Sequence, residues 1–326
     1  MKKIKITDIR NIHIGNAQNL DLGTGCTVII AEKGAPTGID VRGGGPASRD
    51  THILDPMAAA ECIHAILLSG GSAFGLGAAN GVQTYLLEKD IGFDTGIKKV
   101  PLVCQSCIFD LPVGSKDAYP DAEMAYQACI EAQKNQPKSG NYGAGTGASV
   151  GKILGPDYMM KSGLGMAALQ VGNLQVGAIV AVNALGDIFD AETGKKLAGL
   201  QNKEKRGFVK TEEVMYQDIE RRKNYFVENT TIGTIITNGK FNKTELTKIA
   251  ALTHNGYARA INPVHTMADG DSIYAMSVGN VVADLSATGT LAAHVMTLAI
   301  KDAVVSAKPL FGLKSACDYM NNPCNH

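Results

Sequence analysis

Short apolar runs rich in β-branched residues recur along the chain and predict strands. They are bounded by turn-forming residues and are mostly too short for helices of ordinary length. The predicted strands are Cys26–Ala31, Ile63–Leu68, Val100–Cys104, Ala167–Val182, Thr230–Asn238 and Ser272–Val278. The longest of them contains the pair Gly172-Asn173, which predicts a hairpin that turns there.

Apolar residues at helical spacing predict helices between these strands. The predicted helices are Ser72–Lys89, Pro120–Gln133, Lys243–Ala260 and Thr288–Ala307. The third has the clearest start, because Asn242 stands three residues before Glu245, as in a capping box. Strands and helices are mixed without regular βαβ alternation. The pattern therefore favours a layered α+β fold over a doubly wound sheet.

Two segments differ from this pattern. Residues Lys134–Gly147 are polar and rich in glycine, which predicts a surface loop that enters a site. Residues Ala191–Glu228 are the most charged part of the chain and predict an exposed helix or a loose linker. The linker directly precedes Asn229, so a chain end created there would be free to move away.

Composition narrows the class of protein. Lys+Arg and Asp+Glu balance at 31 each, so nothing indicates a nucleic-acid or anionic-membrane partner. No apolar run reaches the roughly 20 residues that span a bilayer, and the first residues do not resemble a signal peptide. Seven cysteines without such a signal predict reduced thiols and a cytoplasmic protein. Cys104 and Cys107 have the spacing of a redox motif, but they end a strand instead of opening a helix, which favours a place in the core or a pocket wall.

Thr230 is the first candidate for chemistry. It begins a strongly β-branched predicted strand and directly follows Asn229. We hypothesise that the chain cuts itself between these residues and then uses the new N-terminal Thr as nucleophile and base. An α-amine has a pKa near 7.7–8.0 in model compounds, which suits a base at neutral pH. The alternative is an ordinary β-branched strand residue.

Other residues could complete such a site. In an extended segment Asp269 and Asp271 would point to one face, where two carboxylates need a cation or hydrogen-bond donors. Lys152, at the end of a glycine-rich loop, is the candidate cation. Asn183 ends an apolar strand and could present its amide to a developing oxyanion, or simply form a turn.

Other possible functional motifs in the sequence lack the residue spacing that their chemistry requires. The glycine loop before Lys152 lacks the spacing of a phosphate loop and has Ile153 where that motif needs Ser or Thr. Ser72 resembles a nucleophile elbow, but Gly75 comes three residues later instead of two, so a helix N-cap is the better interpretation. The histidines lack paired metal spacing, which predicts core or surface roles and no metal site: His52, His64, His254, His265 and His294.

Taken together, these segments resemble one family over nearly the whole chain. It contains the L-aminopeptidase/D-esterases, the β-peptidyl aminopeptidases and the nylon-oligomer (6-aminohexanoate) endohydrolases. The motifs that carry the resemblance are Gly25–Ile29, Gly38–Gly44, Gly70–Leu76, Ile108–Leu111, the glycine loop to Lys152, Asn229-Thr230 and Asp269–Asp271.

The resemblance implies a four-layer α/β/β/α sandwich and autocatalytic cleavage before the nucleophile. The chain would be one self-processing domain, residues 1–326, cut into an α subunit, 1–229, and a β subunit, 230–326. Homotetramers of processed units are common in the family. The catalytic residues carried over are Thr230 as nucleophile, Asp269 and Asp271 orienting it, Lys152 tuning its amine and Asn183 in the oxyanion hole.

The substrate implied is a small amide, a short peptide or an ω-amino oligoamide, with no cofactor. Candidate pocket residues are Gly71, Ser72, Phe109 and Gly145. Phe109 departs from the pattern, because many members have Tyr there and its hydroxyl is missing here. Two alternatives remain open: an acyltransferase like ornithine acetyltransferase that uses the same Thr, and a non-catalytic relative that binds small molecules through the glycine loops.

Overall fold

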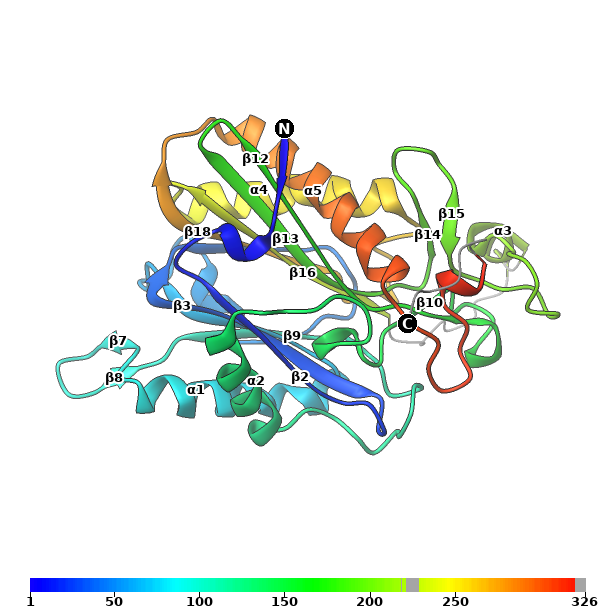
Figure 1. Cartoon of the computed structure of the whole chain (residues 1–326), viewed down its shortest axis with the longest axis horizontal. Helices are drawn as coiled ribbons and strands as arrows, with labels where there is room; N and C mark the ends of the chain where they lie inside the picture. Colours follow the sequence, from blue (N-terminus) through cyan, green and yellow to red (C-terminus); the bar gives the residue numbers. More distant parts are fainter. Residues whose placement is uncertain (218, 221–228, 320–326) are drawn as a thin grey trace.

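Two large β-sheets lie face to face, and a pair of helices covers the outer face of each (Figure 1). The computed structural model describes residues 1–217, 219–220 and 229–319. Within these residues the layers follow the order helices, sheet, sheet, helices. The α+β class and the four-layer α/β/β/α sandwich predicted above are confirmed.

The first sheet has six strands, one of which is the predicted strand that begins at Thr230. Their order is β1 (Lys2–Ile4), β12 (Leu164–Val171), β13 (Leu174–Asn183), β16 (Thr230–Gly239), β18 (Ser272–Val281) and β4 (Thr37–Val41). Only the pair β16 and β18 is parallel; the other neighbours are antiparallel. The helices on this sheet are α4 (Lys243–Ala260) and α5 (Leu285–Val305).

The second sheet has five strands. Their order is β2 (His13–Asn19), β3 (Thr24–Ala35), β6 (Ile63–Ser69), β9 (Val103–Cys107) and β5 (Ala47–Arg49). It is covered by α1 (Ala79–Glu88) and α2 (Ala122–Lys134). Gly15 in β2 lets α2 come close, because a Cβ at that position would lie 2.0 Å from the Ala128 carbonyl oxygen.

Smaller elements lie around the ends of the sandwich. They are β7 (Phe93–Asp94) with β8 (Lys99–Val100), β10 (Ser149–Val150) with β11 (Met160–Lys161), the strands β14 (Asp187–Phe189), β15 (Lys196–Ala198) and β17 (Ile261–Asn262), and the helix α3 (Thr211–Gln217). Figure 1 shows β10, β14, β15 and α3 at one end of the sandwich. Short 3₁₀ helices include Ser72–Ala78 and Gly143–Gly145.

Strand β16 is buried on both faces. Ile232 and Ile236 pack in the core between the sheets, whereas Ile235 packs against α4 and α5. Burying each of these side chains contributes about 1.5–3 kcal/mol to folding. Because side chains alternate along a strand, Thr230 faces the same side as Ile232, toward the layer between the sheets.

Several strand and helix predictions are confirmed closely. The predicted strand Thr230–Asn238 is β16, and the predicted hairpin is β12 and β13 with Gly172 at φ +56° in its turn. The predicted helix Lys243–Ala260 is α4, and its capping box forms through reciprocal hydrogen bonds between Asn242 and Glu245.

Other predictions are wrong in detail. Residues 72–78, predicted as α-helix, form a 3₁₀ helix before α1 begins at Ala79. The predicted strand Val100–Cys104 is divided between β8 and β9. The glycines at the end of Lys134–Gly147 are buried and not on the surface. The charged segment Ala191–Glu228 contains β15 and α3; residues 218 and 221–228 lie outside the described part of the chain.

The cysteines are mostly buried free thiols. Cys104 and Cys107 both lie in β9, and burial raises the pKa of Cys107 to about 12, which disfavours the reactive thiolate. Cys317 is disulfide-bonded, so the prediction of reduced thiols is wrong at that position. Over residues 1–217, 219–220 and 229–319, no helix is long and apolar enough to cross a membrane.

Candidate active site

Thr230 lies at the first position of β16 and is almost completely buried, with 3% of its surface exposed. It is directly opposite Asn183, the last residue of the neighbouring strand β13. Its hydroxyl donates to the carbonyl oxygen of Asn229 at 2.5 Å. The hydroxyl is therefore beside the peptide group that a self-cleavage reaction would attack.

The Asn229 carbonyl is held from a second side. Its oxygen accepts the Gly270 main-chain N–H at 2.8 Å, while the Asn229 N–H donates to Ala268 at 2.8 Å. A Cβ at Gly270 would lie 2.8 Å from the Thr230 hydroxyl oxygen and 2.7 Å from the Gly45 carbonyl oxygen. Glycine at 270 thus leaves room for the hydroxyl and also supplies a donor that polarises the carbonyl.

The two predicted carboxylates lie on either side of Gly270 and are satisfied by different donors. Asp271 accepts the Thr231 N–H at 2.7 Å on one oxygen and the His265 Nδ1 at 2.8 Å on the other. Asp269 accepts the N–H and hydroxyl of Thr266 at 2.9 and 2.6 Å. Burial, with the nearby charge of Asp271, raises the pKa of Asp269 above its usual value.

Lys152 reaches the site through Asn183. Its Nζ donates to the Asn183 side-chain oxygen at 2.6 Å and to the Asn183 main-chain oxygen at 3.1 Å. The same carboxamide donates to the Phe109 carbonyl oxygen at 2.9 Å. Burial lowers the pKa of Lys152 to about 7, although the charges of Asp269 and Asp110 oppose that shift. Lys152 can therefore change protonation state near neutral pH.

Two further buried charges support this site and were missed by sequence reasoning. Asp110 accepts the Gly71 N–H at 2.6 Å and the Thr24 hydroxyl at 2.8 Å, and burial raises its pKa to about 6. Lys161 donates to main-chain oxygens of Gly145, Ala148 and Ser162, which fixes the glycine loop before Lys152. Burial lowers the pKa of Lys161 to about 7.

The glycine-rich loops meet the site from different directions. Gly45 donates its N–H to the main-chain carbonyl oxygen of Asp269 at 2.8 Å, and Gly43 donates its N–H to the main-chain carbonyl oxygen of Asp271 at 3.3 Å. The Gly71 loop is joined through Asp110, as described above. Gly145 packs closely on the start of β12, since a Cβ there would lie 1.9 Å from the Leu164 nitrogen. The role of Gly145 in a substrate pocket stays a prediction, as do those of Gly71 and Phe109.

Ser72 does not cap a helix as predicted. It is the first residue of the 3₁₀ helix, Gly71 occupies the N-cap position, and Ser72 itself has φ +52°. Its N–H donates to the Ile108 carbonyl oxygen at 2.9 Å. The structure therefore gives Ser72 a place in the loop next to Asp110, and its role in a substrate pocket stays a prediction.

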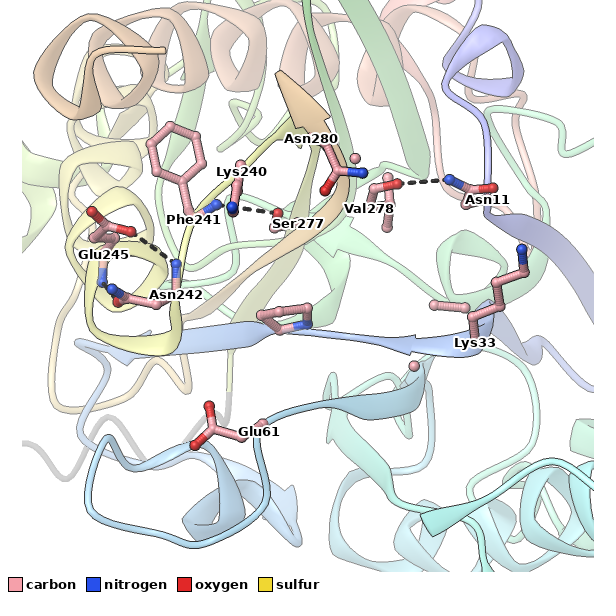
Figure 2. Close-up of a pocket in the computed structure, with 14 residues that line it drawn as sticks. Asn11, Lys33, Glu61, Lys240, Phe241, Asn242, Glu245, Ser277, Val278 and Asn280 are labelled. Atoms are coloured by element: carbon pink, nitrogen blue, oxygen red, sulfur yellow. Dashed lines mark hydrogen bonds between the residues drawn. The ribbon is translucent and has the colours of Figure 1, made fainter. Parts of the chain in front are cut away.

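A large cavity lies elsewhere and is shown in Figure 2. It has a volume of about 550 Å³ and is lined by residues that include Lys33, Lys240, Phe241 and Asn280. β16 and β18 both begin at the Thr230 site and end at this cavity. A ten-residue strand is roughly 30 Å long, so this cavity is not where Thr230 would act. In the described residues, no group of three or more His, Cys, Asp or Glu is placed to hold a metal ion.

Comparison with known proteins agrees with the fold and the resemblance. Residues 5–317 match the model of peptidase family S58. An uncharacterized aminopeptidase of Mycobacterium tuberculosis is 33% identical, covering 96% of this chain and 97% of that protein. A 6-aminohexanoate-oligomer endohydrolase of Kocuria sp. is 31% identical, covering 91% of this chain and 84% of that protein.

Solved structures share the architecture at low sequence identity. A β-aminopeptidase of Burkholderia sp. aligns with a TM-score of 0.67 at 19% identity, covering 95% of this chain and 89% of its own. The L-aminopeptidase D-Ala-esterase/amidase of Ochrobactrum anthropi, described as a variant of the Ntn hydrolase fold, aligns with a TM-score of 0.68 at 16% identity, covering 93% and 86%. With a family match over nearly its whole length, this chain belongs to peptidase family S58.

Proposed function

We propose that this protein is a self-processing amide hydrolase whose nucleophile is the hydroxyl of Thr230. One observation carries the proposal. The Thr230 hydroxyl lies 2.5 Å from the Asn229 carbonyl oxygen, and the Gly270 N–H binds the same oxygen at 2.8 Å. A nucleophile and an oxyanion donor therefore meet at one buried peptide group.

Self-cleavage would follow from this geometry in two steps. The Thr230 hydroxyl loses its proton as its oxygen forms a bond to the Asn229 carbonyl carbon. The bond from that carbon to the Thr230 nitrogen then breaks, and the nitrogen takes up a proton to become a free amine. Water then hydrolyses the resulting ester, which leaves a carboxylate on Asn229 and regenerates the hydroxyl. During the attack the Gly270 N–H stabilises the negative charge that develops on the carbonyl oxygen.

Turnover would use the same hydroxyl with the new α-amine as its base. A protonated Lys152 in this buried site disfavours a second positive charge, so it lowers the pKa of the amine. Asn183, opposite Thr230, would contribute an amide N–H to the substrate oxyanion. Asp269 and Asp271 fix the two residues that flank Thr230, Asn229 by strand pairing and Thr231 by a hydrogen bond. The proposed chemistry uses protein groups and water, without a cofactor.

We infer that the substrates are short peptides or ω-amino oligoamides. The relatives include aminopeptidases and 6-aminohexanoate-oligomer endohydrolases. Both site carboxylates already accept hydrogen bonds from the protein, which leaves few of their acceptor positions for a substrate ammonium group. This favours oligoamides over strict aminopeptidase specificity. We also propose a cytoplasmic homotetramer of processed units that binds neither nucleic acid nor membrane.

We expect the purified protein to consist of two fragments, residues 1–229 and 230–326, of 229 and 326 − 229 = 97 residues. The reason is the position of the Thr230 hydroxyl beside the Asn229 carbonyl. Intact mass under denaturing conditions and N-terminal sequencing would check this, with the smaller fragment starting Thr-Thr-Ile-Gly. A fully active enzyme with an uncut chain would refute the proposal.

We expect the mature enzyme to hydrolyse a short amide at similar rates with a free and with an acetylated N-terminus. The measurement compares the two versions of one oligoamide and adds a free amine as a competing acceptor. Complete loss of activity on acetylation would indicate an obligatory aminopeptidase and contradict the oligoamide preference. A cut protein that transfers the acyl group to the amine and not to water would instead be an acyltransferase.

A further inference from the structure

His265 binds Asp271 through the carboxylate oxygen that does not bind Thr231. Its ring nitrogen Nδ1 is 2.8 Å from one oxygen of Asp271, and its main-chain N–H donates to the same oxygen at 3.2 Å. The other oxygen of Asp271 accepts the Thr231 N–H at 2.7 Å. An ionised carboxylate has no hydrogen to donate and can only accept hydrogen bonds. We therefore assign the hydrogen of this pair to Nδ1 of His265.

Two aromatic side chains from α4 hold the imidazole ring in place. The ring of His254 meets it edge to face with 4.7 Å between centroids, and the ring of Tyr257 stacks on it at 6.0 Å. His254 is in turn fixed by its Nε2, 3.0 Å from the Asp40 carbonyl oxygen. The ring of His265 is 17% exposed, so solvent competes little for its hydrogen bond to Asp271.

The backbone of His265 is unusual as well. Its φ of +58° lies in the left-handed region, which a residue other than glycine adopts at some cost in free energy. This conformation directs the main-chain N–H and the ring nitrogen to the same carboxylate oxygen. His265 therefore binds one oxygen of Asp271 through two donors, its main-chain N–H and its ring nitrogen.

We propose that His265 is a positioning residue for the nucleophile. It fixes Asp271, Asp271 fixes the Thr231 N–H, and Thr231 fixes the start of β16 where the Thr230 hydroxyl meets the Asn229 carbonyl. The inference rests on the proposed function, in which Thr230 is the nucleophile. It adds a residue that touches neither the hydroxyl nor the carbonyl and acts through Asp271.

Substitutions of His265 can separate its hydrogen bond from its backbone conformation. Asparagine tolerates the left-handed region, and its amide nitrogen is the same number of bonds from the backbone as Nδ1. Aspartate has the same shape and a similar tolerance, but it places a second carboxylate against Asp271. Glycine adopts this φ without strain and has no side-chain donor.

The experiment measures the rate of self-cleavage for these variants after expression as precursors. We expect His265→Asp and His265→Gly to slow cleavage by roughly ten- to hundredfold, the loss expected for a hydrogen bond to a charged group. His265→Asn should recover most of the wild-type rate. His52→Asp is the control for adding a charge. His52 is exposed and far from His265 in the sequence, so this variant should cleave like the wild type. Equal rates for the Asn, Asp and Gly variants would overturn the proposal, as would an Asn variant as slow as Asp.

A second measurement does not depend on cleavage. In the uncut Thr230→Ala chain, hydrogen–deuterium exchange is followed in the peptide 229–233, which contains the Thr231 N–H. Adding His265→Gly should increase exchange there, whereas adding His265→Asn should not; equal exchange in both would overturn the proposal. If the wild-type chain proves not to cut itself, the proposed function fails, and this measurement still decides whether His265 holds Asp271.

Discussion

Replacing Thr230 by alanine is expected to leave one intact chain of 326 residues that hydrolyses no amide. Both self-cleavage and turnover need the same oxygen atom, and no other hydroxyl in the described site bonds to the Asn229 carbonyl. Loss of a nucleophile removes the covalent route entirely, so the fall in rate should be about a thousandfold or more. Denaturing electrophoresis and an amide-hydrolysis assay on the same preparation would check both consequences.

Two companion variants make the Thr230→Ala result specific. Thr230→Ser should retain partial cleavage, because the hydroxyl remains and only the methyl group that restricts χ1 is lost. Ser72→Ala should be processed largely as the wild type is, because Ser72 lies in the loop next to Asp110 and not at Asn229. Cleavage that persists in Thr230→Ala would place the nucleophile elsewhere, and Thr231 would be examined first.

Replacing Gly270 by alanine is expected to stop self-cleavage almost completely. The added Cβ would lie 2.8 Å from the Thr230 hydroxyl oxygen and 2.7 Å from the Gly45 carbonyl oxygen, closer than real contacts allow. Either the hydroxyl or the Gly43–Gly45 loop must move. A displacement of about 1 Å at a reacting group costs on the order of a hundredfold in rate. The conversion of precursor to fragments over time measures this effect.

Gly77→Ala is the matched control for the Gly270 variant. A Cβ at Gly77 would meet no atom within 4 Å, and neither glycine has a positive φ. The two substitutions therefore add the same methyl group, one beside the nucleophile and one in open space. Rapid cleavage in Gly270→Ala, at the rate of Gly77→Ala, would show that the hydroxyl does not react from the position described here.

The parts of the fold that could be predicted are those with strong local patterns. β16 follows from its β-branched run, and α4 follows from Asn242 and Glu245 at capping-box spacing. β2 was not predicted, because His13–Asn19 alternates weakly and takes its place by pairing with β3. The start of the predicted helix at Ser72 is 3₁₀, since Gly75 and Gly77 weaken an α-helix there.

The candidate site was predictable where residues begin or end strands. Thr230 begins β16, Asn183 ends β13 and Asp271 directly precedes β18, so the order of strands in the sheet brings them together. Asp110 and Lys161 have no spacing pattern, because each joins the site through loops that only the folded chain brings close. His265 was assigned a core or surface role, although it binds Asp271. Its position six residues before Asp271 was the one indication in the sequence that the two side chains could meet.

The order of strands in the six-stranded sheet has a consequence for how the protein is made. Residues 230–326 supply β16 and β18, which lie in the middle of the sheet, while β13 and β4 on their two sides belong to residues 1–229. After a cut at Thr230, β16 and β18 of the smaller fragment would therefore lie between β13 and β4 of the larger fragment. Because the reacting groups come from both fragments, the sheet must be assembled before the bond can break. Activation by cleavage would then require correct folding, and a misfolded chain would remain an inactive precursor.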